Sequence, residues 1–591
     1  MCGIHLIWGK GANQEAIHSL MERAQHRGPD QSATYSPWPG MWVGVNRLKI
    51  LHPGPEADQP FWSPDGSAFL IWNGELYNYQ DLRNLLLRMG VEFFTQSDTE
   101  VLLHWLRIFG AKGLEKIQGM FALIYVDLSI QQALVARDKN GEKPLYFHQN
   151  QDSLIISSEN RGIAALVNAK LDQNQLDYFF YLRTPQPGRT FFKGVKEWKS
   201  SRFSEIKQHS AFRWDNIQIL PQKEIPKTAT TFKGLLLDAI LKQFHADAPV
   251  GMMLSGGADS SLLYALWYRQ TGIPLPSYTI QTEQKYSSKY ADGTFSSKFS
   301  QQFPMDHQLV KVDQKVFLDH LAEYVVSLDY PVGDSASFLT WLIGQEAQMK
   351  VKVLISGAGA DELWGGYQRH QAFDRYLQYQ KLLLAVKPWV KFLPWSRRRK
   401  KFFAGIDPDP NRTFLNFSAL QAIPGDLFSD YERVFNKNLS PYTRMLDFDR
   451  QVYLVQDVLK IQDNALMAHG IEGRSPYLDE NLIQFWRSIA DEELLKNKRW
   501  IKELLEELDL SWVAKRSKFG FGLPLQEWFS ENGPFSERVV DGLAELYRNY
   551  GSLFNLEAKA LLVHPKKFRN SHFLTLYNLF ILGEWLKLHK L

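Results

Sequence analysis

Hydrophobic residues in the first part of the chain occur in short runs that turn residues separate. Short apolar runs bounded by turn signals are typical of buried strands. Two longer stretches instead have the pattern of helices. The expected strands are 4–8, 68–72, 121–126 and 153–156, with a turn cluster at 63–66, and the expected helices are 79–89 and 99–109. This order predicts layered sheets with flanking helices.

The pattern changes after residues 184–226, an irregular segment with Pro185, Pro187, Gly188 and several lysines. We place the linker near its end. Residues 250–254 form an apolar run before a glycine-rich loop and a helix, and residues 351–355 lead into a second such loop. This alternation predicts a parallel α/β sheet, and the chain from about residue 371 has a mostly helical pattern. We therefore expect an α/β protein with domains at 1–215 and 226–591.

Composition narrows the class of protein. The 591 residues exceed the size of one hydrophobic core, and 45% hydrophobic with 22% charged residues is ordinary for a globular protein. A net charge of +4 gives no reason to propose nucleic acid. One cysteine excludes an intrachain disulfide and fits a reducing compartment. No signal peptide or apolar membrane span is apparent, so we expect a cytoplasmic protein.

A basic run at 397–401 follows the aromatic stretch 389–395. Such a run can contact an acidic surface or membrane headgroups. The alternative, which is the more common case, is a solvated helix end or loop. The sequence leaves both interpretations open.

The single cysteine, Cys2, directly follows the initiator methionine. Removal of Met1, which the small side chain at position 2 favours, would leave a thiol and a free α-amino group on one residue. The thiolate is a strong nucleophile, and an α-amino group with a pKa of about 8 can accept its proton. The alternative is an inert cysteine near a frayed terminus.

Eight short motifs around Cys2 occur in an order that is specific as a set. They are Cys2-Gly3-Ile4, His26-Arg27-Gly28-Pro29-Asp30, Arg47-Leu48, the segments 73–78, 97–100 and 141–146, Arg137-Asp138 and Ser158-Glu159. Together, across about 160 residues, they resemble class II glutamine amidotransferases. That resemblance implies an Ntn-type αββα sandwich that hydrolyses glutamine, with Cys2 as the nucleophile.

The resemblance also assigns roles that suit each residue type. The side-chain amide of Asn73 and the backbone N–H of Gly74 would stabilise the tetrahedral oxyanion. Arg47 would bind the carboxylate of glutamine as a bidentate cation, and Asp98 its ammonium group; Glu75 belongs to the same set. Taken singly, these residues have structural alternatives: a turn for Asn73-Gly74, a surface ion pair for Arg47 and a helix cap for Asp98.

Two glycine-rich loops carry the chemistry of the second domain. Residues 255–261 (SGGADSS) resemble the pyrophosphate-binding loop of N-type ATP pyrophosphatases, where backbone N–H groups bind an anion. Residues 356–367 resemble the paired element of asparagine synthetases. The resemblance implies Asp259 and Asp361 as Mg²⁺ ligands, and Lys518 as the lysine that neutralises phosphate charge. The implied ATP contacts are Leu254, Ser255, Gly256, Gly257, Asp259, Ser260, Ile280, Ser356 and Gly357.

The resemblance to glutamine-hydrolysing asparagine synthetase covers nearly the whole chain. It implies that ATP and Mg²⁺ activate aspartate as β-aspartyl-AMP, which ammonia from glutamine converts to asparagine. Many members are homodimers, so a homodimer is an expectation here. One position departs from the pattern: Ala358 stands where many synthetases carry an acidic residue, and either Glu362 or Glu472 would have to replace that carboxylate. Two alternatives therefore stay open, an enzyme that amidates another carboxylate (a sugar acid, a peptide or a cell-surface precursor), and a degenerate synthetase that only binds.

Overall fold

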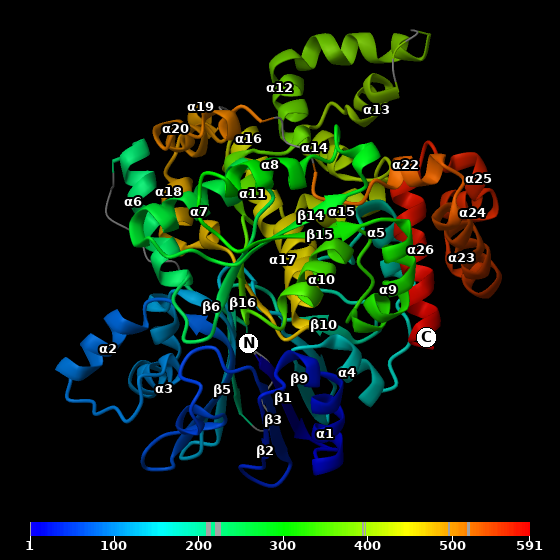
Figure 1. Ribbon diagram of the computed structural model, residues 1–591. Coiled ribbons are helices and arrows are strands. Elements are labelled where there is room, and N and C mark those ends of the chain that lie inside the picture. Colours follow the sequence, from blue (N-terminus) through cyan, green and yellow to red (C-terminus); the bar gives the residue numbers. More distant parts are fainter. Residues whose placement is uncertain are drawn as a thin grey trace.

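A computed structural model describes residues 2–207, 214–218, 226–392, 395, 397–494, 497–516 and 520–590. The N-terminal part forms the lower body in Figure 1, and the remainder of the chain is stacked above it. Both chain termini that the figure marks lie near the level where the two bodies meet.

The N-terminal body contains two antiparallel sheets of six strands each. The first has the order β10-β8-β9-β1-β3-β2 and the second β12-β11-β7-β6-β5-β4. The strands of the first sheet are β1 (Cys2–Gly9), β2 (Gln31–Tyr35), β3 (Met41–Arg47), β8 (Tyr146–Gln149), β9 (Ser153–Ser157) and β10 (Val195–Glu197). Those of the second are β4 (Phe61–Trp62), β5 (Ala68–Leu76), β6 (Gly119–Asp127), β7 (Gln132–Arg137), β11 (Arg202–Lys207) and β12 (Asp215–Asn216).

The two sheets pack face to face because alternate residues of their strands are apolar and point inward. Ile4 and Leu6 of β1 meet Phe69 and Ile71 of β5 in one buried cluster. Helices α1 (Gln14–Arg23) and α4 (Asn160–Leu166) cover the first sheet, and α2 (Tyr79–Arg88) and α3 (Asp98–Phe109) cover the second. The expected αββα sandwich is confirmed. The segment that we expected to be irregular nevertheless contributes β10, β11 and β12. β10 and β12 are edge strands, and β11 lies between β12 and β7.

The second body is built on a parallel five-stranded sheet of order β15-β14-β13-β16-β17. Its strands are β13 (Val250–Met253), β14 (Ser277–Thr282), β15 (His307–Val312), β16 (Val353–Ile355) and β17 (Glu472–Arg474). Its flanking helices include α6 (Ala229–Gln243), α7 (Ala258–Thr271), α8 (Asp292–Ser300), α9 (Gln314–Ser327) and α10 (Ala336–Ala347). All five strands run parallel, and the order in which strands are added reverses between β13 and β16. Ligands of such sheets bind at that switch point, beyond the carboxyl ends of the strands.

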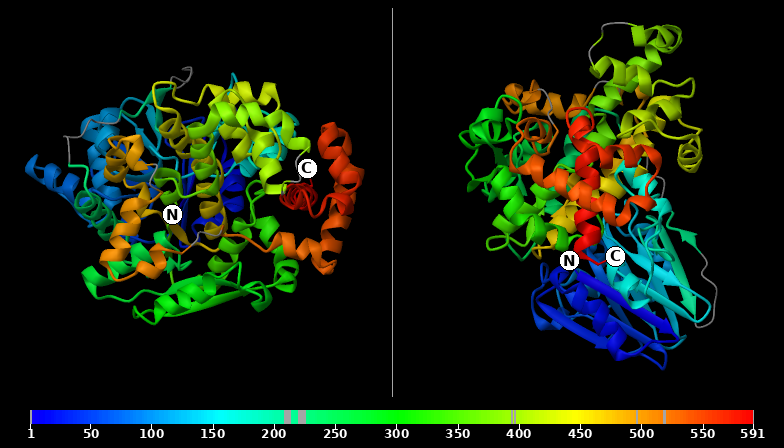
Figure 2. Two further views of the ribbon diagram at one scale, coloured as in Figure 1. Left: turned by 90° about the horizontal axis from the view of Figure 1, so that it is seen from above. Right: turned by 90° about the vertical axis from the view of Figure 1, so that its right-hand side faces the viewer.

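The rest of the second body is helical, as expected. The path passes through α11 (Ala360–Trp364), α12 (Gln368–Val386), a 3₁₀ helix (Lys387–Phe392), α13 (Arg397–Gly405), α14 (Pro410–Ser418), α15 (Gly425–Glu432) and α16 (Pro441–Phe448). A π-helix (Asp449–Val458) and α17 (Leu459–Met467) then lead to β17, and the last long helices are α18 (Glu480–Arg487), α20 (Arg499–Glu507), α23 (Pro534–Tyr550) and α26 (Phe573–Leu588). The π-helix is a departure from the ordinary α-helices that a helical pattern predicts, and α17 begins directly after it at Leu459. Figure 2 shows α12 and α13 projecting from the body.

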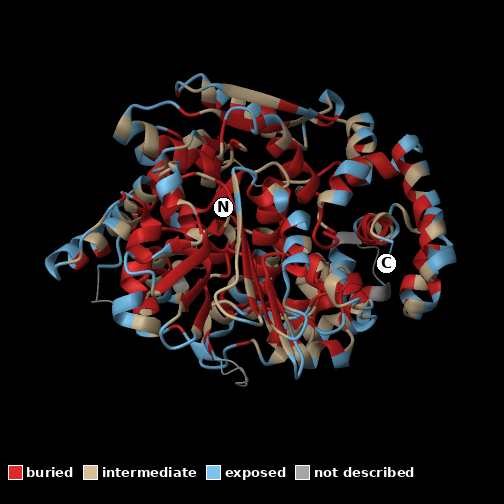
Figure 3. Ribbon diagram, turned by 90° about the horizontal axis from the view of Figure 1, so that it is seen from below, coloured by how far each residue is buried: buried red, intermediate tan, exposed pale blue. Residues whose placement is uncertain are grey.

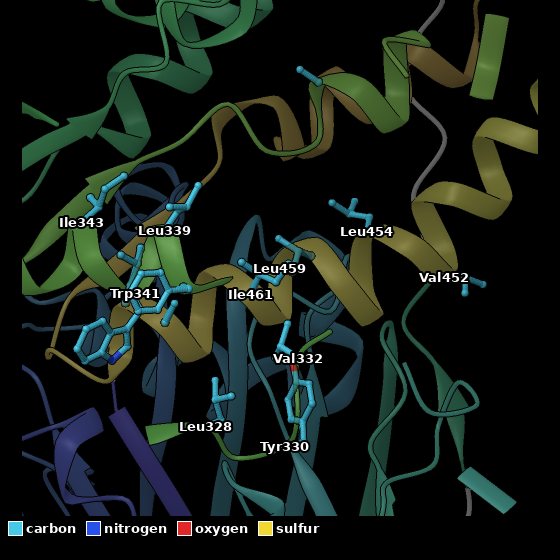
Figure 4. Packing of buried hydrophobic residues seen from close by; sticks show 14 of the residues in the cluster. Leu328, Tyr330, Val332, Leu339, Trp341, Ile343, Val452, Leu454, Leu459 and Ile461 are labelled. Carbon is cyan, nitrogen blue, oxygen red and sulfur yellow. The ribbon is translucent and has the colours of Figure 1, made fainter. Parts of the chain in front are cut away.

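Helix α17 runs through the interior of the second body, and every one of its residues is buried. The buried strands and helices of both bodies are visible from below in Figure 3. Figure 4 shows Leu459 and Ile461 of α17 near Tyr330 and Val332, with Trp341 of α10 in the same cluster. Burial on all sides fixes the position of α17 and therefore of the side chains that it carries. Within the described residues, no helix combines the length and apolar character that crossing a bilayer requires.

Candidate functional site

The predicted nucleophile begins the first strand. Cys2 is buried and lies opposite Arg47 in the register of β1 and β3. Its backbone N–H donates to Oδ1 of Asn73 at 2.9 Å, and Nε2 of Gln59 lies 3.8 Å from its Sγ. Burial raises the pKa of the Cys2 thiol. A neighbouring base must therefore take the proton when the sulfur attacks.

Asn73 and Gly74 lie on β5 beside Cys2. The side-chain Nδ2 of Asn73 is buried and has no hydrogen-bond partner among the described residues. A buried, unpaired donor is costly unless a ligand uses it, so this atom suits the predicted oxyanion. A side chain at Gly74 would place its Cβ 2.2 Å from the carbonyl oxygen of Met120. The close packing of β5 against β6 thus requires glycine at this position.

The three residues expected to hold glutamine have different surroundings. Arg47 is buried and donates to Oδ1 of Asp58 at 2.6 Å and to the carbonyl of His52 at 2.9 Å. Asp98, at the start of α3, accepts from the backbone N–H of Leu76 at 3.1 Å, and burial raises its pKa to about 6. The hydrogen bond from the backbone N–H of Leu76 in β5 keeps the Asp98 carboxylate beside the strand that carries Asn73.

Glu75 is placed differently. Its carboxylate contacts Nη2 of Arg474 in the second body at 2.9 Å, with both side chains buried. Arg474 in turn contacts Glu472 at 2.6 Å. Burial outweighs the attraction of Arg474 and raises the pKa of Glu75 to about 8. The side chain of Glu75 therefore belongs to the junction between the two bodies.

The two glycine-rich loops meet at the switch point of the parallel sheet. The first follows β13, and Ser255, Ser260 and Gly257 are joined there by hydrogen bonds of 3.2 Å. Gly256 has φ +65°, and a Cβ there would lie 2.6 Å from the backbone nitrogen of Ser296. Gly257 immediately precedes α7, so the loop presents backbone amides at a helix N-terminus, an arrangement that binds phosphate.

The second loop touches the first. A Cβ at Gly357 would lie 3.0 Å from the Cβ of Asp259, and the Ser356 hydroxyl contacts Oε1 of Gln462 at 2.5 Å. Leu254 and Ile280 are buried on the adjacent strand ends. The structure thus brings together the predicted ATP contacts from both loops. The remaining predicted residue, Lys518, lies outside the described residues.

Asp259 and Asp361 share one cation. Nζ of Lys498 lies 2.6 and 2.7 Å from the two carboxylate oxygens of Asp259 and 2.5 Å from Oδ1 of Asp361. Lys498 is buried and directly precedes α20, with φ +57°. Two carboxylates that converge on one cation fit a magnesium ion, which takes carboxylate oxygens together with phosphate oxygens.

Sequence reasoning missed Lys498 and the contacts of Arg516. Arg516 donates to the carbonyl of Ser255 at 2.9 Å and contacts Asp292 at 2.5 Å. Arg516 lies two residues before the predicted Lys518, whereas Lys498 lies in none of the motifs. The contacts of Lys498 with Asp259 and Asp361 become visible only in the fold, which places Lys498 between two loops that are distant in sequence.

Family models match both bodies. The model "Glutamine amidotransferase domain" matches residues 1–214, and the model "Asparagine synthase" matches residues 231–587. The chain belongs to the asparagine synthase family. It is a glutamine-dependent enzyme of the asparagine synthetase type, a carbon–nitrogen ligase of amino-acid metabolism.

Relatives span nearly the full length. The chain is 26% identical over 565 residues to asparagine synthetase [glutamine-hydrolyzing] 1 of Bacillus subtilis (strain 168), covering 89% of this chain and 88% of that protein. It is 28% identical to a putative asparagine synthetase [glutamine-hydrolyzing] of Mycobacterium bovis, covering 87% and 84%. It is also 23% identical to amidase chry2 of Gibberella zeae, covering 89% and 87%.

Helix α17 connects the two sites through neighbouring residues. Asp463 binds both terminal nitrogens of Arg27 at 2.8 and 3.0 Å, and Nε of Arg27 lies 3.4 Å from the carbonyl of Cys2. Gln462, the preceding residue, contacts Ser356 of the nucleotide loop. All of these side chains are buried. A single rigid helix therefore fixes the glutaminase strand relative to the loops of the synthetase sheet.

The structure separates the two carboxylates that the sequence offered as substitutes at Ala358. Glu472 lies at the amino end of β17, opposite to the strand ends that carry the nucleotide loops, and binds Arg474 at the domain junction. Glu362 is on α11, directly after Asp361, and contacts the Tyr367 hydroxyl at 2.5 Å. Of the two, only Glu362 lies on the same side of the sheet as the loop of Ala358.

Proposed function

We propose that this enzyme transfers ammonia from glutamine to ATP-activated aspartate, and releases asparagine, glutamate, AMP and pyrophosphate. The observation that carries the proposal is helix α17, which contacts the Cys2 strand through Arg27 and Asp463 and the nucleotide loop through Gln462. The first half-reaction passes ammonia to the second, and a fixed spacing between the two sites positions that ammonia for its acceptor.

In the glutamine half, the Cys2 sulfur attacks the carboxamide carbon of glutamine. Asn73 Nδ2 and the Gly74 N–H would donate to the oxyanion, each such donor being worth about 3 kcal/mol. Collapse of the tetrahedral species expels ammonia and leaves a γ-glutamyl thioester, which water hydrolyses. The thiol proton passes to the departing nitrogen by way of a base, for which the α-amino group of Cys2 is the candidate once Met1 is removed.

In the synthetase half, the amides of residues 255–260 and the α7 N-terminus would bind the phosphates of ATP. Asp259 and Asp361 would hold Mg²⁺, which neutralises charge on the leaving pyrophosphate. A carboxylate oxygen of aspartate attacks the α-phosphorus, the bond to pyrophosphate breaks, and β-aspartyl-AMP forms. Ammonia then attacks the activated carbonyl, and AMP departs with the electron pair of the broken C–O bond.

Ammonia would cross between the bodies along α17. A cavity of about 10 Å³ lies there, lined by Glu142, Lys143, Leu459, Gln462, Asp463 and Gly473. That volume has room for one water-sized molecule, which is the size of ammonia. The cavity lies beside Gln462 and Asp463, the two residues that join the sites, and so supports this route.

Ala358 favours a second candidate, an enzyme of the same kind that amidates another carboxylate. Alanine cannot ionise or bind metal, and Glu362 is already engaged with Tyr367. If Glu362 does not replace the missing carboxylate, the acceptor is a different acid, such as a sugar acid or a peptide.

Pyrophosphate release distinguishes the two candidates. Purified enzyme would be supplied with MgATP and glutamine, with and without aspartate, and the products analysed for asparagine. We expect strong stimulation by aspartate. Intact glutamine hydrolysis without that stimulation would refute aspartate as the acceptor and direct the search to other carboxylates, which the same assay can test one by one.

A further inference from the structure

One segment of the chain carries charge of a single sign. Between Asp374 and Asp407 there are nine lysine or arginine residues and no aspartate or glutamate. Removing these nine from the 68 basic residues leaves 59 against 64 acidic residues, so the rest of the chain has a net charge of −5. We call residues 375–406 the basic hairpin. A block of this kind marks an electrostatic footprint for an anionic surface.

The described parts of the basic hairpin, residues 375–392, 395 and 397–406, project from the protein. Helix α12 is interrupted at Tyr379, whose φ of −121° and ψ of 20° are not helical. The chain beyond it, with α13, extends from the end of the second body that lies away from the glutaminase sandwich (Figures 1 and 2). Trp395 and Phe403 pack at 5.1 Å, and Phe402 stacks on Phe417 of α14 at 5.3 Å. These ring contacts pack α13 against Trp395 and against α14 of the second body.

Large apolar side chains are exposed on the same element. Tyr379, Leu382, Trp389 and Phe392 are 56%, 62%, 66% and 71% exposed. Their separations of three, seven and three residues follow one side of a helical path. Exposed apolar side chains of this size, gathered on one projection, indicate an interaction surface rather than chance exposure.

Exposed cations lie on the same element. Arg375, Lys381, Arg399 and Lys400 are exposed, and the guanidinium of Arg399 lies 6.0 Å from the ring of Trp395. Aromatic rings prefer the headgroup level of a bilayer, and long cationic side chains reach the lipid phosphates from there. Binding at that level requires no membrane-spanning helix.

We propose that the basic hairpin docks this enzyme on the surface of an anionic lipid bilayer. The aromatic and aliphatic side chains would enter the headgroup region, and the cations would contact lipid phosphates. Nucleic acid would account for the positive charge but not for the exposed apolar side chains of Leu382 and Trp389. A bilayer accounts for both observations. The proposal does not depend on the acceptor of the ligation reaction.

Vesicle co-sedimentation of the full chain tests the proposal. Vesicles would contain phosphatidylglycerol in phosphatidylcholine, or phosphatidylcholine alone. One variant reverses charge (Arg399→Glu, Lys400→Glu, Lys401→Glu) and one removes aromatic rings (Trp389→Ala, Phe392→Ala). The matched controls lie on the glutaminase sandwich: exposed Lys170→Glu, Lys193→Glu and Lys196→Glu, and exposed Met89→Ala with Phe94→Ala. Glutamine hydrolysis is measured for each protein to show that it is folded.

We expect wild type to bind the anionic vesicles only, and more weakly as salt shortens the screening length. The charge-reversal variant should lose at least about tenfold in partitioning, and the aromatic variant should lose the binding that persists at high salt. Both controls should bind as wild type does. No vesicle binding by wild type, or an equal loss in the controls, would overturn the proposal. So would binding of a single-stranded oligonucleotide without vesicle binding, because it would assign the surface to nucleic acid.

Discussion

Replacement of Asn73 by alanine tests the glutaminase site most directly. The substitution removes a buried oxyanion donor, Nδ2, and also the acceptor of the Cys2 N–H bond at 2.9 Å. Loss of one oxyanion donor costs about 2.7–4 kcal/mol, and loss of an ordinary hydrogen bond about 0.5–1.5 kcal/mol. Together about 3–5 kcal/mol predict a fall of roughly 150-fold to 5,000-fold in glutamine-dependent kcat/KM.

The assay compares glutamine with free ammonia as the nitrogen source. Ammonia-dependent pyrophosphate release should be unchanged in Asn73→Ala, as in Cys2→Ala, because the synthetase loops are untouched. Asn73→Asp separates the two effects, since it keeps the acceptor and removes the donor. Asn78→Ala is the matched control. Among the described residues, the Asn78 side chain donates to the carbonyl of Lys116 at 2.9 Å and accepts from the backbone N–H of Gln118 at 3.0 Å.

A fall of less than tenfold in Asn73→Ala, with ammonia-dependent activity retained, would refute the oxyanion role. An equal fall in Asn73→Ala and the Asn78 control would point to general damage of β5 instead. The first result would require another donor for the tetrahedral intermediate.

Other predictions address the remaining groups. Asp98 must be ionised to bind the ammonium group of glutamine, and burial raises its pKa to about 6. The KM for glutamine should therefore rise about tenfold per pH unit below pH 6 and stay constant above it. A constant KM down to pH 5 would contradict this role of Asp98. Lys498→Met should lower pyrophosphate release on the order of 100-fold or more, with an unchanged rate of glutamine hydrolysis. Lys518→Ala should have the same effect. Lys502→Met, one turn further along α20, should change neither rate by much. Asp463→Asn, which removes the ionic partner of Arg27, should lower the amount of ligated product per glutamine hydrolysed; an unchanged ratio would show that this ion pair does not couple the sites.

The sequence was most informative where chemistry is local. Strands β1, β5, β6 and β9 and helices α2 and α3 of the sandwich were predicted from the apolar pattern, and the other strands and helices of the sandwich were not. Cys2, Asn73 and the loop 255–261 were predicted from motifs in which backbone and side chains of neighbouring residues act together. The π-helix over 449–458 was not predicted, because apolar spacing cannot distinguish its hydrogen-bond register from that of an α-helix.

Contacts between residues that are far apart in the sequence were not predicted. Lys498 lies 239 positions from Asp259, and nothing near it in the sequence marks it as their shared cation. Glu75 belongs to the glutamine motif, yet its carboxylate is bound by Arg474, 399 positions away by residue number. Such contacts depend on how two bodies are stacked, and no local pattern encodes that arrangement.

The junction between the bodies is unusually polar for a buried surface. Arg27 binds Asp463, Arg474 binds Glu75, and Glu197 contacts Lys460 at 3.2 Å, with every one of these side chains buried. Buried ion pairs add little net stability compared with well-packed apolar residues, because desolvation offsets the attraction. They do impose distance and angle, most strongly where an arginine is bidentate. An interface that has to keep the Cys2 strand and the Ser356 loop in fixed register along α17 gains from that geometric constraint, and an apolar junction would permit sliding. We infer that these ion pairs serve the spacing of the two sites, so their loss should uncouple the half-reactions before it unfolds either body.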